Sequence, residues 1–176
     1  KHALEDYRAR QVFAIKNCPM HQEPLLLLPR YLRPEIEKKL GVKIKGDLCP
    51  PCRHTLDEHT DKDTGIVSWL DIPVETFTFS IQGTRGIGSF EPSDEKTSDV
   101  PDLVGKENIG ITSNPEKGYE HWQAYTLTGE LQKANRGICE GREMIKTHPK
   151  LLYVFISVAE EQEIKRPEDR NDAPRC

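Results

Sequence analysis

Two short pairs of metal-ligating residue types near the start of the chain constrain its fold most. Cys18-Pro-Met-His21 and Cys49-Pro-Pro-Cys52 each place two such residues across a two-residue spacer, and a connector of 27 residues separates the pairs. Each pair can direct both side chains toward one ion, and two pairs complete a closed tetrahedral shell. Three thiolates with one imidazole suit zinc better than magnesium or calcium. The spacing therefore predicts a structural zinc site formed by Cys18, His21, Cys49 and Cys52.

Two alternatives to this ligand set remain open in the sequence. His54 and His59 follow Cys52 closely, and either could replace His21 as the fourth ligand. The second pair could instead be a redox-active dithiol, because C-x-x-C is also the thioredoxin-like motif. A redox pair of that kind should follow a strand and open a helix.

The composition supports a small core that benefits from a metal. Apolar residues make up 35% of the 176-residue chain, charged residues 31%, and 13 prolines and 12 glycines interrupt it. A closed zinc site adds folding free energy directly. Five cysteines, with two of them in one close pair, fit metal ligation in a reducing compartment better than a secreted disulfide framework. We therefore expect an intracellular protein of the cytoplasm or nucleus, without a membrane segment.

Apolar patterning predicts a mixed architecture. Helices are expected over residues 2–16 and over 33–41, where Pro34 suits the first turn and Gly41 the C-cap. A further, glycine-weakened helix is expected around 134–146. Extended segments are expected at 24–29, 42–45, 66–70, 75–81 and 121–127. The apolar, β-branched run 151–158 predicts a central strand.

These elements predict an α+β fold with a mostly antiparallel sheet, a few helices and an N-terminal zinc-knuckle lobe. The expected organisation is a helical, zinc-knuckle lobe over residues 1–60 and a β-rich core over 61–159. Within the core, residues 83–118 are rich in Gly, Ser, Asp, Glu and Pro, which predicts a long mobile loop. Residues 160–176 form a charged tail.

The segment 30–53, which covers most of the connector and the second ligand pair, is basic, although the whole chain has a net charge of −4. Residues 30–53 hold seven cations against three acids, and Tyr31 among them could stack on a base. The predicted partner-binding residues are Arg30, Tyr31, Arg33, Lys38, Lys39, Lys43, Lys45 and Arg53. A solvated face that binds nothing is the simpler interpretation of the same charges.

One segment resembles a known enzyme class. His121-Trp-Gln123 is similar to the histidine motif of rolling-circle replication initiators of the HUH endonuclease class, and Phe77-Thr-Phe-Ser80 loosely resembles their first motif. This resemblance implies that His121 would ligate a catalytic divalent metal in a nuclease. The chain departs from the class where a nucleophilic tyrosine should precede a lysine by three residues, because Ile156 follows Tyr153 at that spacing.

The remaining motif matches predict turns or loops. Gly83-Thr-Arg-Gly-Ile-Gly88 has no expected helix after it to cradle a phosphate, and Asp61-Lys-Asp63-Thr-Gly65 lacks the ligands of a calcium loop. We find no Ser-His-Asp arrangement whose spacing is typical of a catalytic site. The sequence therefore predicts a non-enzymatic, zinc-stabilised interaction module that binds a protein partner through its basic lobe. A nucleic-acid-binding domain is the alternative and a metal-dependent nuclease the remote one, whereas a small-molecule ligand is not expected.

Overall fold

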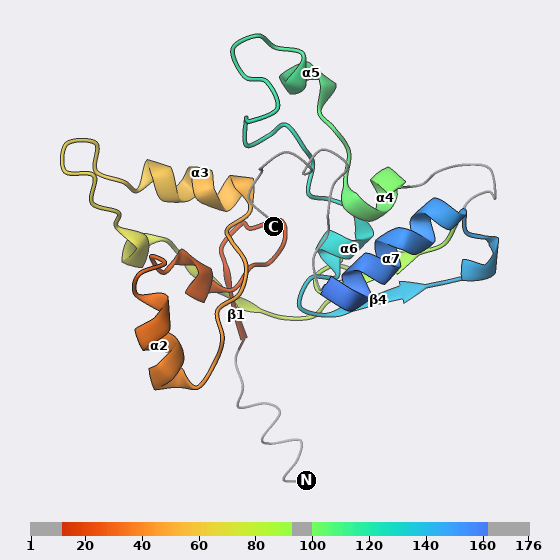
Figure 1. Cartoon of the computed structure of the whole chain (residues 1–176), viewed down its shortest axis with the longest axis horizontal. Coiled ribbons are helices and arrows are strands. Elements are labelled where there is room, and N and C mark those ends of the chain that lie inside the picture. Colours follow the sequence, from red (N-terminus) through yellow and green to blue (C-terminus); the bar gives the residue numbers. More distant parts are fainter. Residues whose placement is uncertain (1–11, 93–99, 162–176) are drawn as a thin grey trace.

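The computed structural model describes residues 12–92 and 100–161. Within them the elements are β1 (Val12–Ile15), η1 (Pro24–Leu27), α2 (Arg33–Leu40), α3 (Pro50–Glu58), η2 (Trp69–Asp71), β2 (Val74–Phe77), β3 (Ile87–Phe90), α4 (Val100–Val104), α5 (Ile109–Thr112), α6 (Glu130–Lys133), β4 (Ile138–Gly141), η3 (Met144–Lys146) and α7 (Pro149–Glu161). Figure 1 shows β1, α2 and α3 on one side of the molecule, and α4, α6, β4 and α7 on the other.

The strands form two small sheets of opposite type. β1 pairs with β2 in an antiparallel ladder in which Ile15 faces Val74. β3 pairs with β4 in parallel, with Ile87 opposite Ile138 and Phe90 opposite Gly141. The mixed α+β class is therefore confirmed. A mostly antiparallel sheet is not, because one described sheet is antiparallel and the other is parallel.

Two apolar clusters form the interior. The first surrounds the cysteine pairs and buries Ile15, Met20, Leu27, Leu48, Ile72 and Leu127 together with Cys18, Cys49 and Cys52. The second fills the space between the parallel strands and their helices, and buries Phe90, Leu103, Val104, Leu131 and Leu151. Each half of the molecule thus has its own core, although Leu127 of the later sequence packs into the first one.

The short helix after the first ligand pair forms as predicted. α2 begins at Arg33 with Pro34 in its first turn, and Gly41 caps it in the left-handed conformation at φ 67°. Lys39 also pairs with Glu35 one turn earlier, at 2.6 Å. Local signals decide this helix, because proline fixes its start and only glycine adopts the capping geometry without strain.

The run 151–158, predicted as a central strand, belongs instead to the helix α7. Leu151 is fully buried, and Val154, Phe155 and Val158 pack on the same cluster, which is the spacing of one helical face. Leu152, Tyr153 and Ile156 lie on the exposed side. The periodicity of a short, continuous apolar run does not distinguish a strand from a helix, so the packing of the whole chain determines which one forms.

Several other predicted elements differ from the structure. Residues 12–15 of the expected first helix form β1, and the rest of that helix lies outside the described residues. The expected strand 121–127 consists of bends, turns and irregular backbone with one antiparallel bridge, from Tyr125 to Glu107, and 24–27 is a 3₁₀ helix. The range 83–118, expected to be a mobile loop, contains β3, α4 and α5 among its described residues. No helix of the described ranges is long and apolar enough to cross a membrane.

Candidate functional site

Three cysteines meet in the first core. Cys18, Cys49 and Cys52 are 4%, 0% and 3% exposed, and none of them is in a disulfide. Their sulfur atoms all lie within 4.8 Å of one another, and the Sγ atoms of Cys18 and Cys49 are 3.8 Å apart. The two motifs that are far apart in sequence therefore converge on one point, as the spacing predicted for three of the four ligands.

Helix α3 positions two of these thiols. Cys49 is its N-cap residue, and Cys52 lies in its first turn after Pro50 and Pro51. Proline suits this position because its missing N–H would have no helical partner there. The partial positive charge of the helix N-terminus would stabilise thiolates at both cysteines once a bound cation has displaced their protons. No strand precedes the pair among residues 41–49, so the thioredoxin-like context is incomplete.

A tight turn after β1 positions the third thiol. The His21 amide donates to the Cys18 carbonyl at 3.1 Å, and the Gln22 amide donates to the Cys18 sulfur at 3.3 Å. Asn17 and His21 both adopt positive φ, at 61° and 49°, which is uncommon for residues other than glycine. This conformation turns the backbone back toward Cys18, so that the Gln22 N–H donates to the Cys18 sulfur.

Gln22 joins the two ligand pairs and was missed by sequence reasoning. Its side chain is buried, accepts a hydrogen bond from the Cys49 amide at 2.7 Å and donates one to the Asp47 carbonyl at 3.0 Å. The only sign of this role in the sequence is that an amide side chain directly follows the first ligand pair, Cys18–His21. We call this pair the first knuckle and Cys49–Cys52 the second knuckle. Gln22 therefore sets the distance between Cys18 and Cys49.

Replacing Gln22 by Ala should lower the free energy of unfolding by about 1–3 kcal/mol, because the buried Cys49 amide and Asp47 carbonyl would lose their partners. Urea denaturation of the full chain measures this change. Gln123→Ala is the matched control, since Gln123 is exposed and should change stability by less than about 0.5 kcal/mol. Equal effects of the two substitutions would show that Gln22 does not join the knuckles.

The three thiols do not ionise independently. Hydrogen bonds from Cys49, and then from Cys52, hold the pKa of Cys18 far below its ordinary value. The hydrogen bonds to Cys18 raise the pKa of both Cys49 and Cys52. One thiolate is thus stabilised by two neighbouring thiols. A bound cation would deprotonate all three.

The structure does not bring a histidine into the sulfur group among the described residues. The His21 ring lies 5.4 Å from the Phe77 ring, and burial lowers its pKa, which favours neutral imidazole. His54 stacks on Trp122 at 4.7 Å, and His59 Nδ1 lies 2.8 Å from the Thr55 carbonyl oxygen. Both alternative ligands are therefore engaged elsewhere.

The predicted partner-binding residues divide into two groups. Arg30 holds Asp47 through both carboxylate oxygens, at 2.8 and 2.7 Å. Arg33 donates to the carbonyls of Leu26, Leu28 and Gly46. These arginines shape the connector between the knuckles.

The other predicted contact residues differ in exposure. Arg53 is half-buried, and its Nε is buried without a hydrogen-bond partner among the described residues. The exposed members are Tyr31, Lys38, Lys39, Lys43 and Lys45. Partner binding by this surface stays a prediction.

The second half of the molecule clamps the first knuckle. Asn135 Nδ2 donates to the Met20 carbonyl at 2.6 Å. Arg136 Nη1 donates to the carbonyls of His21, at 3.1 Å, and Phe13, at 2.7 Å. Both side chains come from the turn between α6 and β4. Sequence reasoning missed them because their partners lie more than one hundred residues earlier.

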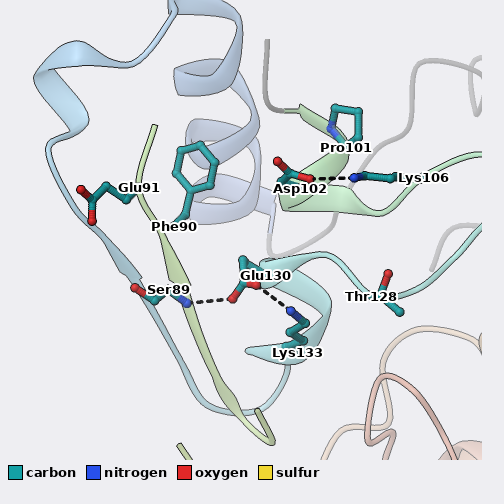
Figure 2. Close-up of a pocket in the computed structure, with 9 residues that line it drawn as sticks. All are labelled: Ser89, Phe90, Glu91, Pro101, Asp102, Lys106, Thr128, Glu130 and Lys133. Carbon is teal, nitrogen blue, oxygen red and sulfur yellow. Dashed lines mark hydrogen bonds and ion pairs between the residues drawn. The ribbon is translucent and has the colours of Figure 1, made fainter. Parts of the chain in front are cut away.

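A polar cleft of about 400 Å³ lies beside the carboxyl end of β3. Figure 2 shows its residues: Ser89, Phe90, Glu91, Pro101, Asp102, Lys106, Thr128, Glu130 and Lys133. Glu130 accepts a hydrogen bond from the Ser89 amide at 2.9 Å and pairs with Lys133 at 2.7 Å. Lys106 pairs with Asp102 at 3.2 Å. The cleft thus offers carboxylates and amines at the end of a parallel strand, where α/β proteins commonly bind ligands.

His121 has none of the surroundings of a nuclease site. Its Nδ1 accepts a hydrogen bond from the Gln123 amide at 3.2 Å, and its ring stacks beside Trp122 at 5.8 Å. No metal-ligand group in the part of the chain that the structure describes includes it. The expected strand that would present it is absent there.

Comparisons with known proteins identify the family. The model of the family described as "PrkA AAA domain" matches residues 1–173. "ATP-dependent protease PrkA" of Bacillus subtilis is 39% identical over 169 residues, which cover 94% of this chain and 26% of that protein. "Serine/threonine kinase YeaG" of Escherichia coli K12 is 35% identical over 87 residues, which cover 47% of this chain and 12% of that protein. No solved structure matches.

These matches overturn the function predicted from sequence. The non-enzymatic interaction module, the nucleic-acid-binding domain and the HUH-type nuclease are wrong, because the chain matches the PrkA AAA domain family and a Bacillus relative that is named an ATP-dependent protease. A zinc-finger or nucleic-acid-binding role for the two ligand pairs is not supported by these matches, whereas zinc binding by the cysteines stays a prediction. The chain spans about a quarter of the length of the Bacillus relative. With a family match over nearly its whole length, the chain belongs to the PrkA AAA domain family.

Proposed function

We propose that this chain is a part of an ATP-dependent enzyme and forms one wall of its nucleotide-using unit. The parallel pairing of β3 with β4 carries the proposal, because the cleft lies at the carboxyl end of β3. Ligands of open α/β sheets bind outside the carboxyl ends of parallel strands. The names of the Bacillus and Escherichia relatives both imply the use of ATP.

The cleft supplies groups suited to a magnesium nucleotide. Carboxylates such as Glu130 and Asp102 can hold Mg²⁺ or orient a water, and Lys106 and Lys133 can neutralise phosphate charge. The sequence contains no G-x-x-x-x-G-K-[ST] phosphate loop. We therefore assign the phosphate-binding loop itself to other parts of the complete protein, because the Bacillus relative is about four times as long as this chain. This proposal replaces the expectation of no small-molecule ligand.

Glu130→Gln in the complete protein should lower ATP hydrolysis about tenfold or more, because the carboxylate charge is lost. The substituted amide still has an oxygen that can accept the Ser89 N–H, so the strand end should keep its structure. Glu116→Gln is the control, since Glu116 is exposed on a turn away from the cleft. Unchanged hydrolysis in Glu130→Gln would exclude this cleft from nucleotide use.

Two reactions follow from the names of the relatives, and the protease is favoured. The Bacillus protease matches 94% of this chain, whereas the Escherichia kinase matches 47%. A protease should degrade an unfolded protein substrate only when ATP is hydrolysed, without transferring phosphate. A kinase should move the γ-phosphate of labelled ATP to serine or threonine. Incubating the complete protein with casein and labelled ATP separates the two reactions.

We also propose a reducing intracellular compartment. Four cysteines of the described ranges are free, and three of them lie together in the core without forming a disulfide. The relatives named above are bacterial proteins, which supports the cytoplasm over a nucleus.

A further inference from the structure

We propose that Cys18, Cys49, Cys52 and His21 bind one Zn²⁺, and that this ion fixes the knuckle to which Asn135 and Arg136 anchor the α6–β4 turn. The proposal is independent of the reaction assigned to the cleft. It concerns how the two halves of the molecule are held together.

The sulfur positions carry the first step. Four ligands at a Zn–S distance of about 2.3 Å in a tetrahedron are about 3.8 Å apart. The Sγ atoms of Cys18 and Cys49 are 3.8 Å apart, and all three sulfurs lie within 4.8 Å. A disulfide requires about 2.05 Å and joins only two sulfurs. Three buried, unlinked thiols around one point therefore match a tetrahedral thiolate site.

The surroundings of the thiols support thiolates. The Gln22 amide donates to the Cys18 sulfur, and α3 directs its N-terminus at Cys49 and Cys52. Hydrogen bonds and dipoles of this kind orient first-shell ligands in metal sites. The apolar residues of the first core exclude water from the site. A redox dithiol of Cys49 and Cys52 would leave the convergence of Cys18 unexplained.

We assign the fourth ligand to His21. It has the same spacing from Cys18 as Cys52 has from Cys49, so the two knuckles are alike. His54 stacks on Trp122 and His59 bonds the Thr55 carbonyl. The His21 ring lies against Phe77 and outside the sulfur group, so the assignment rests on the spacing and requires this ring to turn toward the sulfurs when the ion binds. The positive φ of His21 places it at the bend of the knuckle.

The knuckle carbonyls carry the second step. Met20 lies between Cys18 and His21, and its carbonyl accepts the hydrogen bond of Asn135. The carbonyl of His21, the proposed fourth ligand, accepts the hydrogen bond of Arg136. The Arg136 guanidinium also lies 5.4 Å from the centre of the Phe77 ring. A metal that holds Cys18 and His21 therefore holds both acceptors. The α6–β4 turn leads directly from Lys133 of the cleft.

Metal analysis of the complete protein, purified without chelator, should give about one zinc per chain. Cobalt added to the metal-free protein should produce the visible bands of a tetrahedral cobalt–thiolate site. Cys18→Ser and Cys49→Ser should each lower zinc affinity at least tenfold in chelator competition. Cys139→Ser is the matched control, because Cys139 lies outside the sulfur group. His21→Ala should change the cobalt spectrum, whereas His54→Ala and His59→Ala should not.

The cobalt titration uses the wild-type protein, so it remains decisive even if a cysteine variant does not fold. Wild type that holds no zinc and gives no cobalt–thiolate bands, or that contains a Cys49–Cys52 disulfide, would overturn the site. Zinc loss in Cys139→Ser equal to that in Cys49→Ser would do the same. An unchanged spectrum in His21→Ala would overturn the fourth ligand.

Hydrogen exchange tests the anchoring of the turn. Removing zinc should raise amide exchange across residues 134–138 at least tenfold, whereas α7 on the second core should change little. Arg136→Ala should raise exchange in the same turn while zinc content stays at one per chain. Protection of residues 134–138 that is identical with and without zinc would overturn the link between the ion and the turn.

Discussion

Leu151→Ala should lower the free energy of unfolding of the full chain by about 2–5 kcal/mol. Leu151 is fully buried in the second core, where it packs with Phe90, Leu103 and Leu131. Removing most of its side chain loses apolar burial and leaves a cavity that the neighbouring strand and helices cannot fill. Urea denaturation measures the change in midpoint and in slope.

Its neighbours provide matched controls that also test the helix. Leu152 is 39% exposed and Tyr153 is 70% exposed, so Leu152→Ala should cost clearly less and Tyr153→Ala about 0.5 kcal/mol or less. A strand would bury alternate residues and would make Tyr153 as sensitive as Leu151. Equal losses at Leu151 and Tyr153 would therefore contradict α7.

Gly137→Ala should destabilise the chain by about 1–3 kcal/mol or more, because a Cβ there would lie 1.8 Å from the Gly86 carbonyl oxygen. The obstacle is backbone, so no side-chain rotation relieves it. Ile138, the next residue, donates its amide to the same carbonyl. The close approach of Gly137 to Gly86 thus sets the start of the parallel pairing between β3 and β4.

Gly110→Ala is the matched control for this substitution. Its nearest neighbour would be Asn108 Oδ1 at 3.5 Å, an ordinary contact, and alanine in the helix α5 should be neutral or slightly stabilising. Thermal or urea unfolding of both variants gives the comparison. If the Gly137→Ala protein were as stable as the Gly110→Ala protein, the backbones at Gly86 and Gly137 could move apart at little cost, and the close approach would not be required.

Short-range signals were sufficient for the elements that local chemistry decides. Pro34 and Gly41 defined α2, and the two spacers predicted that Cys18, Cys49 and Cys52 would meet. The same signals failed where an apolar run had no clear period, as at 151–158. They also could not show that Arg30 and Arg33 of the basic segment bond Asp47 and backbone carbonyls, whereas partner binding by that segment stays a prediction.

The prediction of function from the sequence was wrong for a related reason. An open cleft depends on residues from separate segments, such as Ser89, Asp102 and Glu130, and none of these has a recognisable motif around it. The parallel pairing that places them was hidden, because β3 and β4 are only four residues long and 47 residues separate them.

By itself, the sequence determined the convergence of the three cysteines and the capped helix between them. Those features depend on spacers of two residues, on the fixed φ of proline and on the positive φ that glycine tolerates, all of which act over a few bonds. Only the tertiary structure decided that residues 151–158 form a helix, that Gln22 joins the knuckles, and that Asn135 and Arg136 anchor the first knuckle to the second half. Those contacts are favourable only after distant backbone carbonyls and amides are buried together, because each buried polar group then needs a partner that no local pattern supplies.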